Sequence, residues 1–394
     1  MTEGHTLARL GGDEFTILLE DLKNPGDALH VADRLVEILK HPFSIGGHEI
    51  FATASIGVAL NSTGYEGPED LLRDADTAMY RAKALRRNGV EIFDEKMRAS
   101  VVARMQLETE LRHAAERGEF VNWYQLIVNL ETGRIRGFEA LVRWQHPTHG
   151  LLLPDKFIHV AEETGTIIPL GCQVLQEACR QVCAWQQMYP SQPPLIVSVN
   201  LSSKQFLQPD LITQVQHEIE AAAIDPVNLN LEITESMVMS NPLQAKTLID
   251  ELKAIGVRIG MDDFGTGYSS LSYLHRFALD ILKIDRSFIS GMENAPDKLE
   301  IVRAIISLAR NLGLQVIAEG IERREQMLLL KELGCEFGQG YLFSRPLEAD
   351  SATNLLTANP NWLTKRINGE PLPVTNENAR YRIVRYVKTE GSIT

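Results

Sequence analysis

Two adjacent carboxylates, Asp262 and Asp263, give the strongest chemical signal in this sequence. An apolar, β-prone segment containing Ile259 and Met261 precedes them, and a turn rich in glycine and serine follows at 265–270. Two neighbouring like charges are costly in a folded protein unless a cation or a proton relieves the repulsion. The pattern therefore predicts a strand that delivers metal-binding acids to the rim of a fold. The alternative is a helix N-cap at Asp263 ahead of a loop.

The bulk composition is that of a globular protein with room for two or three domains. The chain has 394 residues, of which 44% are hydrophobic and 23% charged, and domains usually contain about 100–200 residues. The net charge of −13, from 39 basic and 52 acidic side chains, argues against binding to duplex nucleic acid, because phosphate neutralisation needs a basic surface. A small phosphate ligand whose charge is met by metal ions remains compatible with this charge.

Cysteine usage and hydropathy predict a cytoplasmic location. The four cysteines form no C-x-x-C pair and suggest no disulfide framework. No apolar run approaches the ~18–20 residues that a membrane helix needs, and the N-terminus lacks the apolar region of a signal peptide. We therefore expect no membrane contact through this chain.

The first part of the chain predicts a small α/β layer. A Gly-Gly-Asp turn at Gly11–Asp13 between apolar arms predicts a β-hairpin. Helices are expected at 27–40 and 68–87, and strands at 49–53 and 55–60.

Three motifs in this part resemble the GGDEF family of diguanylate cyclases: R-L-G-G-D-E-F, A-S-I-G-V-A and L-L-R-D-A-D-T-A-M-Y-R-A-K. The resemblance covers only the second half of that domain, because ten residues precede Gly11 and the family's earlier metal-binding acid and guanine contacts are missing. Asp13 matches a metal-binding position, yet one acid alone cannot hold a nucleotide and its cations. The resemblance implies a partial GGDEF-like domain over 1–94, and we expect no cyclase activity from it.

From residue 119 onward, strands alternate with amphipathic helices, after a charged connecting helix at 95–118. The expected strands are 120–129, 135–143, 195–201, 229–234, 258–263, 281–284, 315–319 and 338–343. The expected helices are 168–188, 210–223, 242–255, 298–312 and 323–333. Eight strands with intervening helices predict a TIM-like (β/α)8 barrel over 119–350, and the short turn 131–133 predicts that it begins with an antiparallel strand.

Polar side chains lie towards the C-terminal ends of these strands, the face at which barrel enzymes build their sites. They are Glu139, Asn200, Glu232, Asp262, Asp263, Lys283, Glu319 and Gln339. Any one of them could be a cap or a surface residue, but five carboxylates on one rim would repel one another without cations. Carboxylate and amide oxygens favour Mg²⁺ or Mn²⁺ over zinc. Two such cations sharing a carboxylate are the arrangement that hydrolyses phosphate diesters.

The same part of the chain resembles the EAL family of cyclic di-GMP phosphodiesterases over about 119–350. The motifs that carry the resemblance are F-E-A-L-V-R-W-Q-H-P, P-D-K-F-I, A-E-E-T-G, V-N-L-S, L-E-I-T-E-S, D-D-F-G-T-G-Y-S-S, L-K-I-D-R-S-F, A-E-G-I-E and Q-G-Y-L-F-S-R-P-L. One departure is Leu126 in Tyr124-Gln125-Leu126-Ile127, where the family commonly has proline. No proposed metal ligand is lost through it.

The resemblance implies a role for each matching residue. One metal would be held by Glu139, Asn200, Glu232 and Asp262, and a second by Asp262, Asp263 and Glu319. Lys283 would activate the water or stabilise charge, Arg143 and Gln339 would face the substrate, Glu235 would brace the loop 264–270, and Glu322 and Asp285 would support the rim. The implied reaction is hydrolysis of cyclic di-GMP to linear 5′-pGpG with two Mg²⁺ or Mn²⁺ ions. Because members of the family often dimerise, the resemblance also implies a possible homodimer through this domain.

Two alternatives to the hydrolase stay open: a cyclic di-GMP receptor that does not hydrolyse its ligand, and a diguanylate cyclase. The C-terminal tail, 351–394, is polar and contains an alternating segment at 379–387 that predicts an edge strand, although its arginine and tyrosine residues could also suggest nucleic-acid contact.

Overall fold

The computed structural model describes residues 5–20, 22, 24–46, 48–61, 67–86, 89–191, 193–265 and 275–363. The chain divides into two compact units, Met1–Glu110 and Leu111–Thr394, and we describe each by itself. The division falls within the long helix α3 (Glu95–Arg117).

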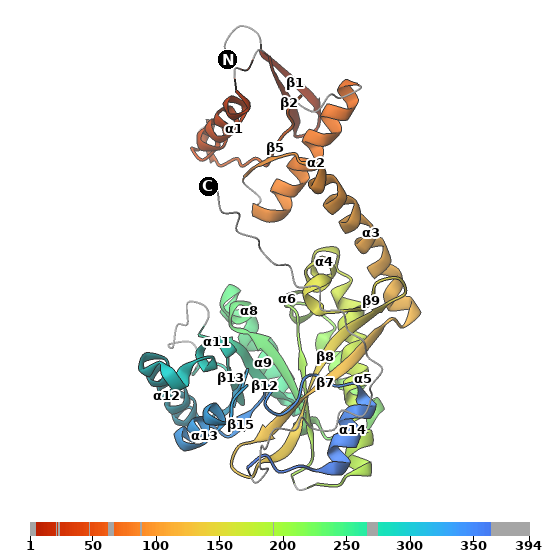
Figure 1. The fold of residues 1–394 in the computed structure, drawn as a ribbon, viewed down its shortest axis with the longest axis vertical. Helices are drawn as coiled ribbons and strands as arrows, with labels where there is room; N and C mark the ends of the chain where they lie inside the picture. The colour runs from red at the N-terminus through yellow and green to blue at the C-terminus, as the bar shows by residue number, and fades with distance from the viewer. Residues whose placement is uncertain are drawn as a thin grey trace, which may run out of the picture. The chain divides into compact units, whose positions relative to one another are not determined.

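The first unit is a small α/β layer of hairpins and helices (Figure 1). Strands β1 (His5–Gly11) and β2 (Glu14–Leu19) form the expected antiparallel hairpin, with Gly12 at a positive φ of 55° in its turn. The other elements are α1 (Pro25–Leu39), β3 (Phe43–Ile45), β4 (His48–Ile50), β5 (Ile56–Val58), α2 (Pro68–Arg86) and β6 (Val90–Ile92). A side chain at Gly57 would meet the backbone of α2 at 2.0 Å, so this glycine permits the close packing of α2 on β5.

The second unit is a closed barrel of eight strands, as the sequence predicted. Going round the barrel, the strands are β7 (Phe120–Asn129), β8 (Arg134–His146), β10 (Ile196–Asn200), β11 (Leu229–Thr234), β12 (Arg258–Phe264), β13 (Ile281–Ile284), β14 (Gln315–Ala318) and β15 (Phe337–Gly338). Strand β7 runs antiparallel to both of its neighbours, β8 and β15, whereas β8 and the other strands are mutually parallel. The short strand β9 (Gly150–Leu152) extends the β8 edge.

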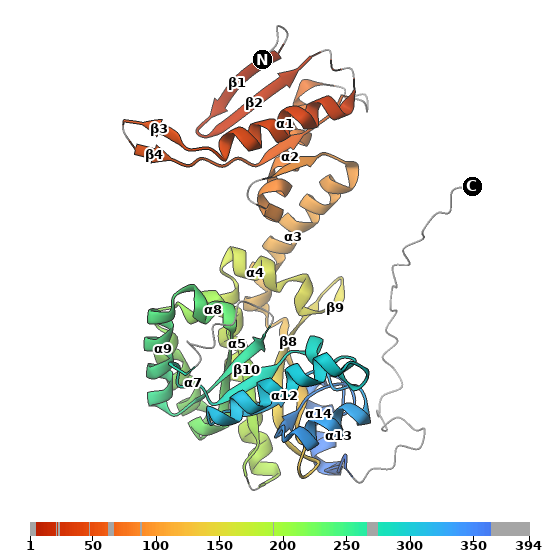
Figure 2. The same ribbon diagram turned by 90° about the vertical axis from the view of Figure 1, so that its left-hand side faces the viewer.

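Helices cover the outside of the barrel (Figure 2). They are α4 (Ile158–Thr164), α5 (Ile167–Met188), α6 (Ser203–Phe206), α7 (Leu211–Ala222), α8 (Glu235–Ser240), α9 (Pro242–Ile255), α11 (Arg286–Ile289), α12 (Pro296–Asn311) and α13 (Arg324–Leu333). The central strands are short and buried on both faces, because helices cover one face and the barrel interior the other.

One side of the barrel interior is filled by a buried apolar cluster. Ile127, Ile281, Ile317 and Phe337 come from β7, β13, β14 and β15 and pack together. Two residues further towards the mouth on these strands, or just past their ends, stand Gln125, Lys283, Glu319 and Gln339. Since side chains alternate between the two faces of a strand, the same strands that build the apolar floor direct polar groups into the mouth above it.

The last part of the barrel differs from the sequence prediction. A strand was expected over 338–343, but the ladder ends at Gly338 and residues 341–343 form a turn. Beyond it, the backbone N–H of Gln339 donates to Ala318, and the N–H of Leu342 donates to Ile321. Gly340 allows this close approach, because a Cβ there would lie 2.2 Å from the carbonyl oxygen of Ile321.

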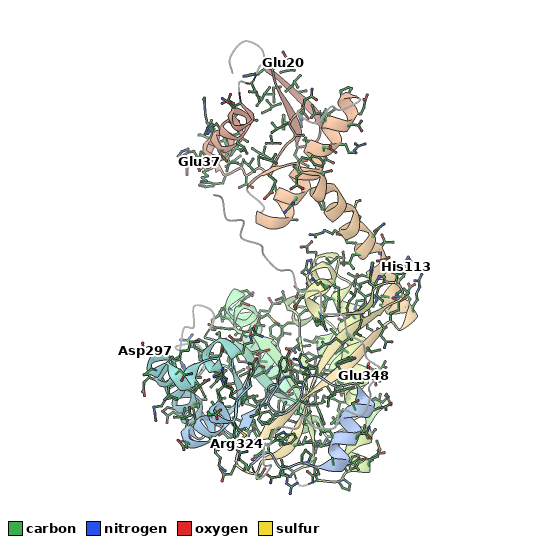
Figure 3. All side chains as sticks on the ribbon, in the orientation of Figure 1. Glu20, Glu37, His113, Asp297, Arg324 and Glu348 are labelled. Carbon is green, nitrogen blue, oxygen red and sulfur yellow. The ribbon has the colours of Figure 1, made fainter. Side chains whose placement is uncertain are left out.

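Helix α14 (Ala349–Ala358) was not predicted and lies beside α5 on the outside of the barrel (Figure 1). Trp185 Nε1 donates to Thr353 Oγ1 at 2.8 Å, and the hydroxyls of Tyr189 and Thr357 lie 2.6 Å apart. Glu348, labelled in Figure 3, is the N-cap residue of this helix. The helix escaped prediction because only Ala352 and Leu356 on it are buried, which is a weak apolar pattern.

The segment after α14 folds back onto the turn between β7 and β8. The backbone N–H of Trp362 donates to Gly133 at 3.1 Å, and its ring meets Phe343 edge-on at 5.7 Å. Arg324, labelled in Figure 3, donates to the carbonyl of Leu363. The edge strand expected at 379–387 lies outside the described residues.

Within the described ranges, no helix combines the length and the apolar character that crossing a membrane requires.

Replacing Trp362 by alanine should destabilise the barrel unit by about 3 kcal/mol, because a buried indole is lost from the closure of the β7–β8 turn. Urea unfolding, followed by circular dichroism, measures the change. Leu243→Ala is the control, since Leu243 is 84% exposed. Equal denaturation midpoints for Trp362→Ala and the control would show that the segment is not part of the cooperative unit.

Candidate functional site

The ammonium of Lys283 lies at the centre of the barrel mouth, surrounded by acids from four other strands. Its Nζ is 2.6 Å from Glu232 Oε2 and 2.7 Å from Glu319 Oε1. Asp262 Oδ2 lies 3.3 Å away and Glu139 Oε2 3.5 Å away. Lys283 is only 1% exposed. The structure thus brings together acids that are up to 180 residues apart in sequence, as the barrel prediction required.

Two predicted amides complete this cluster on the Glu139 side. Asn200 Nδ2 donates to Glu139 Oε1 at 2.6 Å, and Gln339 Nε2 donates to Glu139 Oε2 at 2.6 Å. Gln339 Nε2 also lies 3.0 Å from Gln125 Oε1, an interaction that the sequence did not reveal. Gln339 Oε1 is buried and has no hydrogen-bond partner among the described residues. It is therefore an acceptor available to a ligand.

Glu232 is oriented from below by residues that sequence reasoning missed. Asn230, two positions earlier on β11, donates from Nδ2 to Glu232 Oε1 at 3.1 Å and to Ser198 Oγ at 2.9 Å. Gly260 on the next strand leaves room for it, since a Cβ there would lie 3.1 Å from Asn230 Nδ2. The available signal was a polar residue two positions before a site acid, which alternation places on the same face.

Crowding of the acids shifts their protonation. Burial raises the pKa of Glu232 well above its ordinary value, and the charges of Glu139 and Asp262 raise it further, against the opposing effect of Lys283. Burial likewise raises the pKa of Glu319 to about 7. Burial alone would lower the pKa of Lys283, but Glu139, Glu232, Glu319 and Asp262 raise it well above its ordinary value. Lys283 therefore stays charged, and the repulsion within the cluster is relieved by protonation of carboxylates.

Asp263 occupies a strained position directly after Asp262. Its φ is 55°, an uncommon left-handed conformation for a residue other than glycine. Its backbone N–H donates to Asp262 Oδ1 at 2.8 Å. Burial and the neighbouring charges of Asp262 and Asp285 raise the pKa of its carboxyl. The ladder of β12 is irregular between Met261 and Phe264 at this point, and the side chain of Asp263 is exposed.

Arg143 lies on β8 and stacks on Trp123 of β7. The guanidinium carbon is 5.6 Å from the centre of the indole ring, and Nη1 donates to the carbonyl of Val142. Arg143 Nε is buried without a partner among the described residues. Burial lowers the pKa of Arg143, but a guanidinium remains charged at neutral pH.

Three further predicted residues lie at the edge of the cluster or outside it. Asp285 is the N-cap of α11, where burial opposes ionisation but the hydrogen bonds from Ser287 keep the pKa of its carboxyl below the ordinary value. Glu235 is the first residue of α8 and is 5% exposed. The side chain of Glu322 is exposed, and its backbone N–H donates to Gln326. Of the loop 264–270, only Phe264 and Gly265 lie within the described residues.

The cluster has the donor chemistry of a hard-cation site. Four carboxylates share one ammonium, and the donor atoms around it are carboxylate and amide oxygens. Among the residues that the structure describes, no three acidic, histidine or cysteine side chains form a preassembled metal shell. Instead, the ammonium of Lys283 lies between the carboxylates.

Comparison with known proteins matches each part of the chain to a family. Residues 108–346 match the family model of the EAL domain, and residues 1–89 match that of the diguanylate cyclase GGDEF domain. The bifunctional diguanylate cyclase/cyclic di-GMP phosphodiesterase MucR of Pseudomonas aeruginosa is 42% identical over 345 residues, which are 88% of this chain and 50% of MucR. The cyclic di-GMP phosphodiesterase NbdA of the same organism is 39% identical over 358 residues, 91% of this chain and 45% of NbdA. The chain thus spans about half the length of these relatives.

Among solved structures, the PaMucR phosphodiesterase in complex with c-di-GMP is similar to the barrel unit. It has a TM-score of 0.60 and 42% sequence identity, and the match covers 63% of this chain and 99% of that structure.

Replacing Glu319 by glutamine should change how stability depends on pH when divalent cations are removed with EDTA. Because the pKa of Glu319 is raised from 4.5 to about 7 in the folded chain, the folded state binds more protons than the unfolded state between these values. Its contribution to the free energy of unfolding therefore falls as pH rises through this window, by on the order of 3 kcal/mol. Glu319→Gln removes that fall. Urea unfolding from pH 4.5 to pH 8 compares the two proteins, and parallel pH curves would contradict the assignment.

Proposed function

The chain belongs to the EAL domain family, and we propose that it hydrolyses cyclic di-GMP to linear 5′-pGpG with two Mg²⁺ or Mn²⁺ ions. The observation that carries the proposal is the convergence of Glu139, Glu232, Asp262 and Glu319 on Lys283 in the barrel mouth. A cluster in which four acids share one ammonium would weaken a fold that did not use it, and divalent cations remove the repulsion between the acids. The names of MucR and NbdA support the choice of substrate.

The resemblance to the EAL family implies the ligand roles, and the contacts of the acids with Lys283 support them. Glu139, Asn200, Glu232 and Asp262 would hold one cation, and Asp262, Asp263 and Glu319 the second, with Asp262 shared. The bound cations would supply positive charge to the phosphoryl oxygens and lower the pKa of a water molecule. Asn230 keeps Glu232 in one orientation, and Gln339 and Asn200 do the same for Glu139.

The remaining residues would act on the substrate and on charge. Lys283 would donate a hydrogen bond from its ammonium to the attacking oxygen and stabilise the negative charge that develops on the phosphoryl oxygens. Arg143, whose Nε lacks a partner among the described residues, would bind a phosphate or a base edge. The free acceptor Gln339 Oε1 would receive a hydrogen bond from the ligand. Asp285 and Glu322 would support the rim through the loops that follow β13 and β14.

Glu139→Ala and Asp262→Ala should each lower turnover of cyclic di-GMP by about 100-fold or more, because each removes an oxygen ligand that no neighbour replaces. Chromatography of the product formed in saturating Mg²⁺ measures the loss and identifies 5′-pGpG. Asp297→Ala is the acidic control, since Asp297 is exposed at the start of α12 (Figure 3). Near-native turnover in either site variant would refute the two-cation assignment. Tight binding of intact cyclic di-GMP by the wild type without product would favour the receptor alternative.

Glu235→Ala should fold normally but need about tenfold more Mg²⁺ for half-maximal turnover. Glu235 is buried directly after β11, where it would brace the loop that leaves from Asp262 and Asp263. Losing such outer support typically weakens metal binding 10–100-fold. Turnover measured against Mg²⁺ concentration tests this, with the exposed Glu251→Ala as the matched control. Superimposable curves for wild type and Glu235→Ala would remove the bracing role.

A further inference from the structure

Trp123 differs from the other tryptophans of the chain in its exposure. The sequence has four tryptophans. Trp144 and Trp185 are fully buried and Trp362 is 5% exposed, and each packs on another aromatic ring. Trp123 is half-buried instead. Part of the Trp123 indole therefore stays accessible to a ligand.

The strand register places Trp123 at the barrel mouth. Trp123 pairs with Leu141 across the β7–β8 ladder, and the next pair on the same face is Gln125 with Glu139. Gln125 and Glu139 both accept hydrogen bonds from Gln339 inside the mouth. Since residues two apart on a strand share a face, Trp123 stands one step further out on the face that carries the acid cluster.

Arg143 orients the indole and supplies a positive charge beside it. The two residues are diagonal neighbours in the ladder, where long and aromatic side chains reach one another. The guanidinium carbon lies 5.6 Å from the ring centre, within the range of a cation–π contact. An aromatic ring held in this way keeps a fixed π-face at the entrance and loses little conformational entropy when a ligand binds.

We propose that Trp123 is a stacking platform for one guanine base of the substrate, with Arg143 holding the ring in place. The inference rests on the proposed function, since it takes cyclic di-GMP as the ligand. A flat purine is the part of this ligand that an aromatic face at the rim recognises, while the acid cluster below handles the phosphates. Because every base has a π-face, the platform contributes affinity and base position, and hydrogen-bonding groups supply guanine selectivity.

Tryptophan fluorescence tests the stack directly. Cyclic di-GMP added to the wild type in Ca²⁺, which should bind the acids yet support little turnover, should quench the emission, because Trp123 is the half-exposed indole. Trp123→Phe should lose the quenching while its Kd, measured by calorimetry, stays within about threefold. Unchanged emission at a ligand concentration that calorimetry shows to be saturating would overturn the proposal.

Affinity supplies the second test. Trp123→Ala should raise the Kd for cyclic di-GMP about 5- to 100-fold, the range expected for removing one base–aromatic stack. Trp123→Leu keeps apolar volume without the extended ring and should weaken binding similarly, which protects the test if the alanine variant folds poorly. Leu328→Ala, at an exposed position of α13, should leave the Kd unchanged. A Kd within twofold of wild type in Trp123→Leu would refute the platform.

These readouts separate the platform from the hydrolase proposal. If the wild type binds cyclic di-GMP with quenching but forms no product in Mg²⁺, hydrolysis fails and the platform stands. If it forms product while the Trp123 variants keep the wild-type Kd, the platform fails and hydrolysis stands. Absence of binding by the wild type would overturn both.

Discussion

The ion cluster around Lys283 is the interaction on which the rest of the barrel depends. A buried ammonium is tolerated only with close anionic partners, and the buried carboxylates need it equally. The contacts join β13 to acids on β8, β11 and β12 and to Glu319, which directly follows β14. The same bonds therefore hold the strands at the mouth and assemble the site, so that removing either partner leaves an uncompensated charge inside the barrel.

Two kinds of contact inside the barrel support the acid cluster: apolar packing and hydrogen bonds. Beneath Lys283, the apolar cluster of Ile127, Ile281, Ile317 and Phe337 provides a rigid floor. Beneath Glu232, a polar pair, Asn230 with Ser198, replaces that floor and orients the carboxylate by hydrogen bonds. Gly260 makes this possible, because a Cβ at this position would lie in tight contact with Asn230, 3.1 Å from its Nδ2. Packing thus fixes one half of the site and polar contacts fix the other.

The sequence predicted those parts that leave a one-dimensional pattern. Strands 229–234 and 281–284 were predicted to the residue, because short segments rich in leucine and isoleucine stand out between amphipathic helices. The predicted barrel also implied that the polar side chains at the C-terminal ends of its strands lie close together. What escaped were features set by contacts between distant segments: the turn after Gly338, the helix α14 against α5, and the support of Glu232 by Asn230. The strained φ of Asp263 likewise has no signature in a pair of aspartates. Local periodicity cannot report any of these.

The reversed direction of β7 determines where the polypeptide enters the barrel. In the parallel strands, the chain arrives at the floor and leaves at the mouth, but β7 begins at Phe120, opposite Trp144 near the far end of β8. The chain leaving α3 at Arg117 therefore reaches the mouth first, and only four residues separate Phe120 from Gln125, which contacts Gln339. A pull on, or a twist of, the helix that precedes the barrel would reach the substrate rim along one short strand, without passing through the hydrophobic floor. The chain therefore enters the barrel on the same side as the acid cluster.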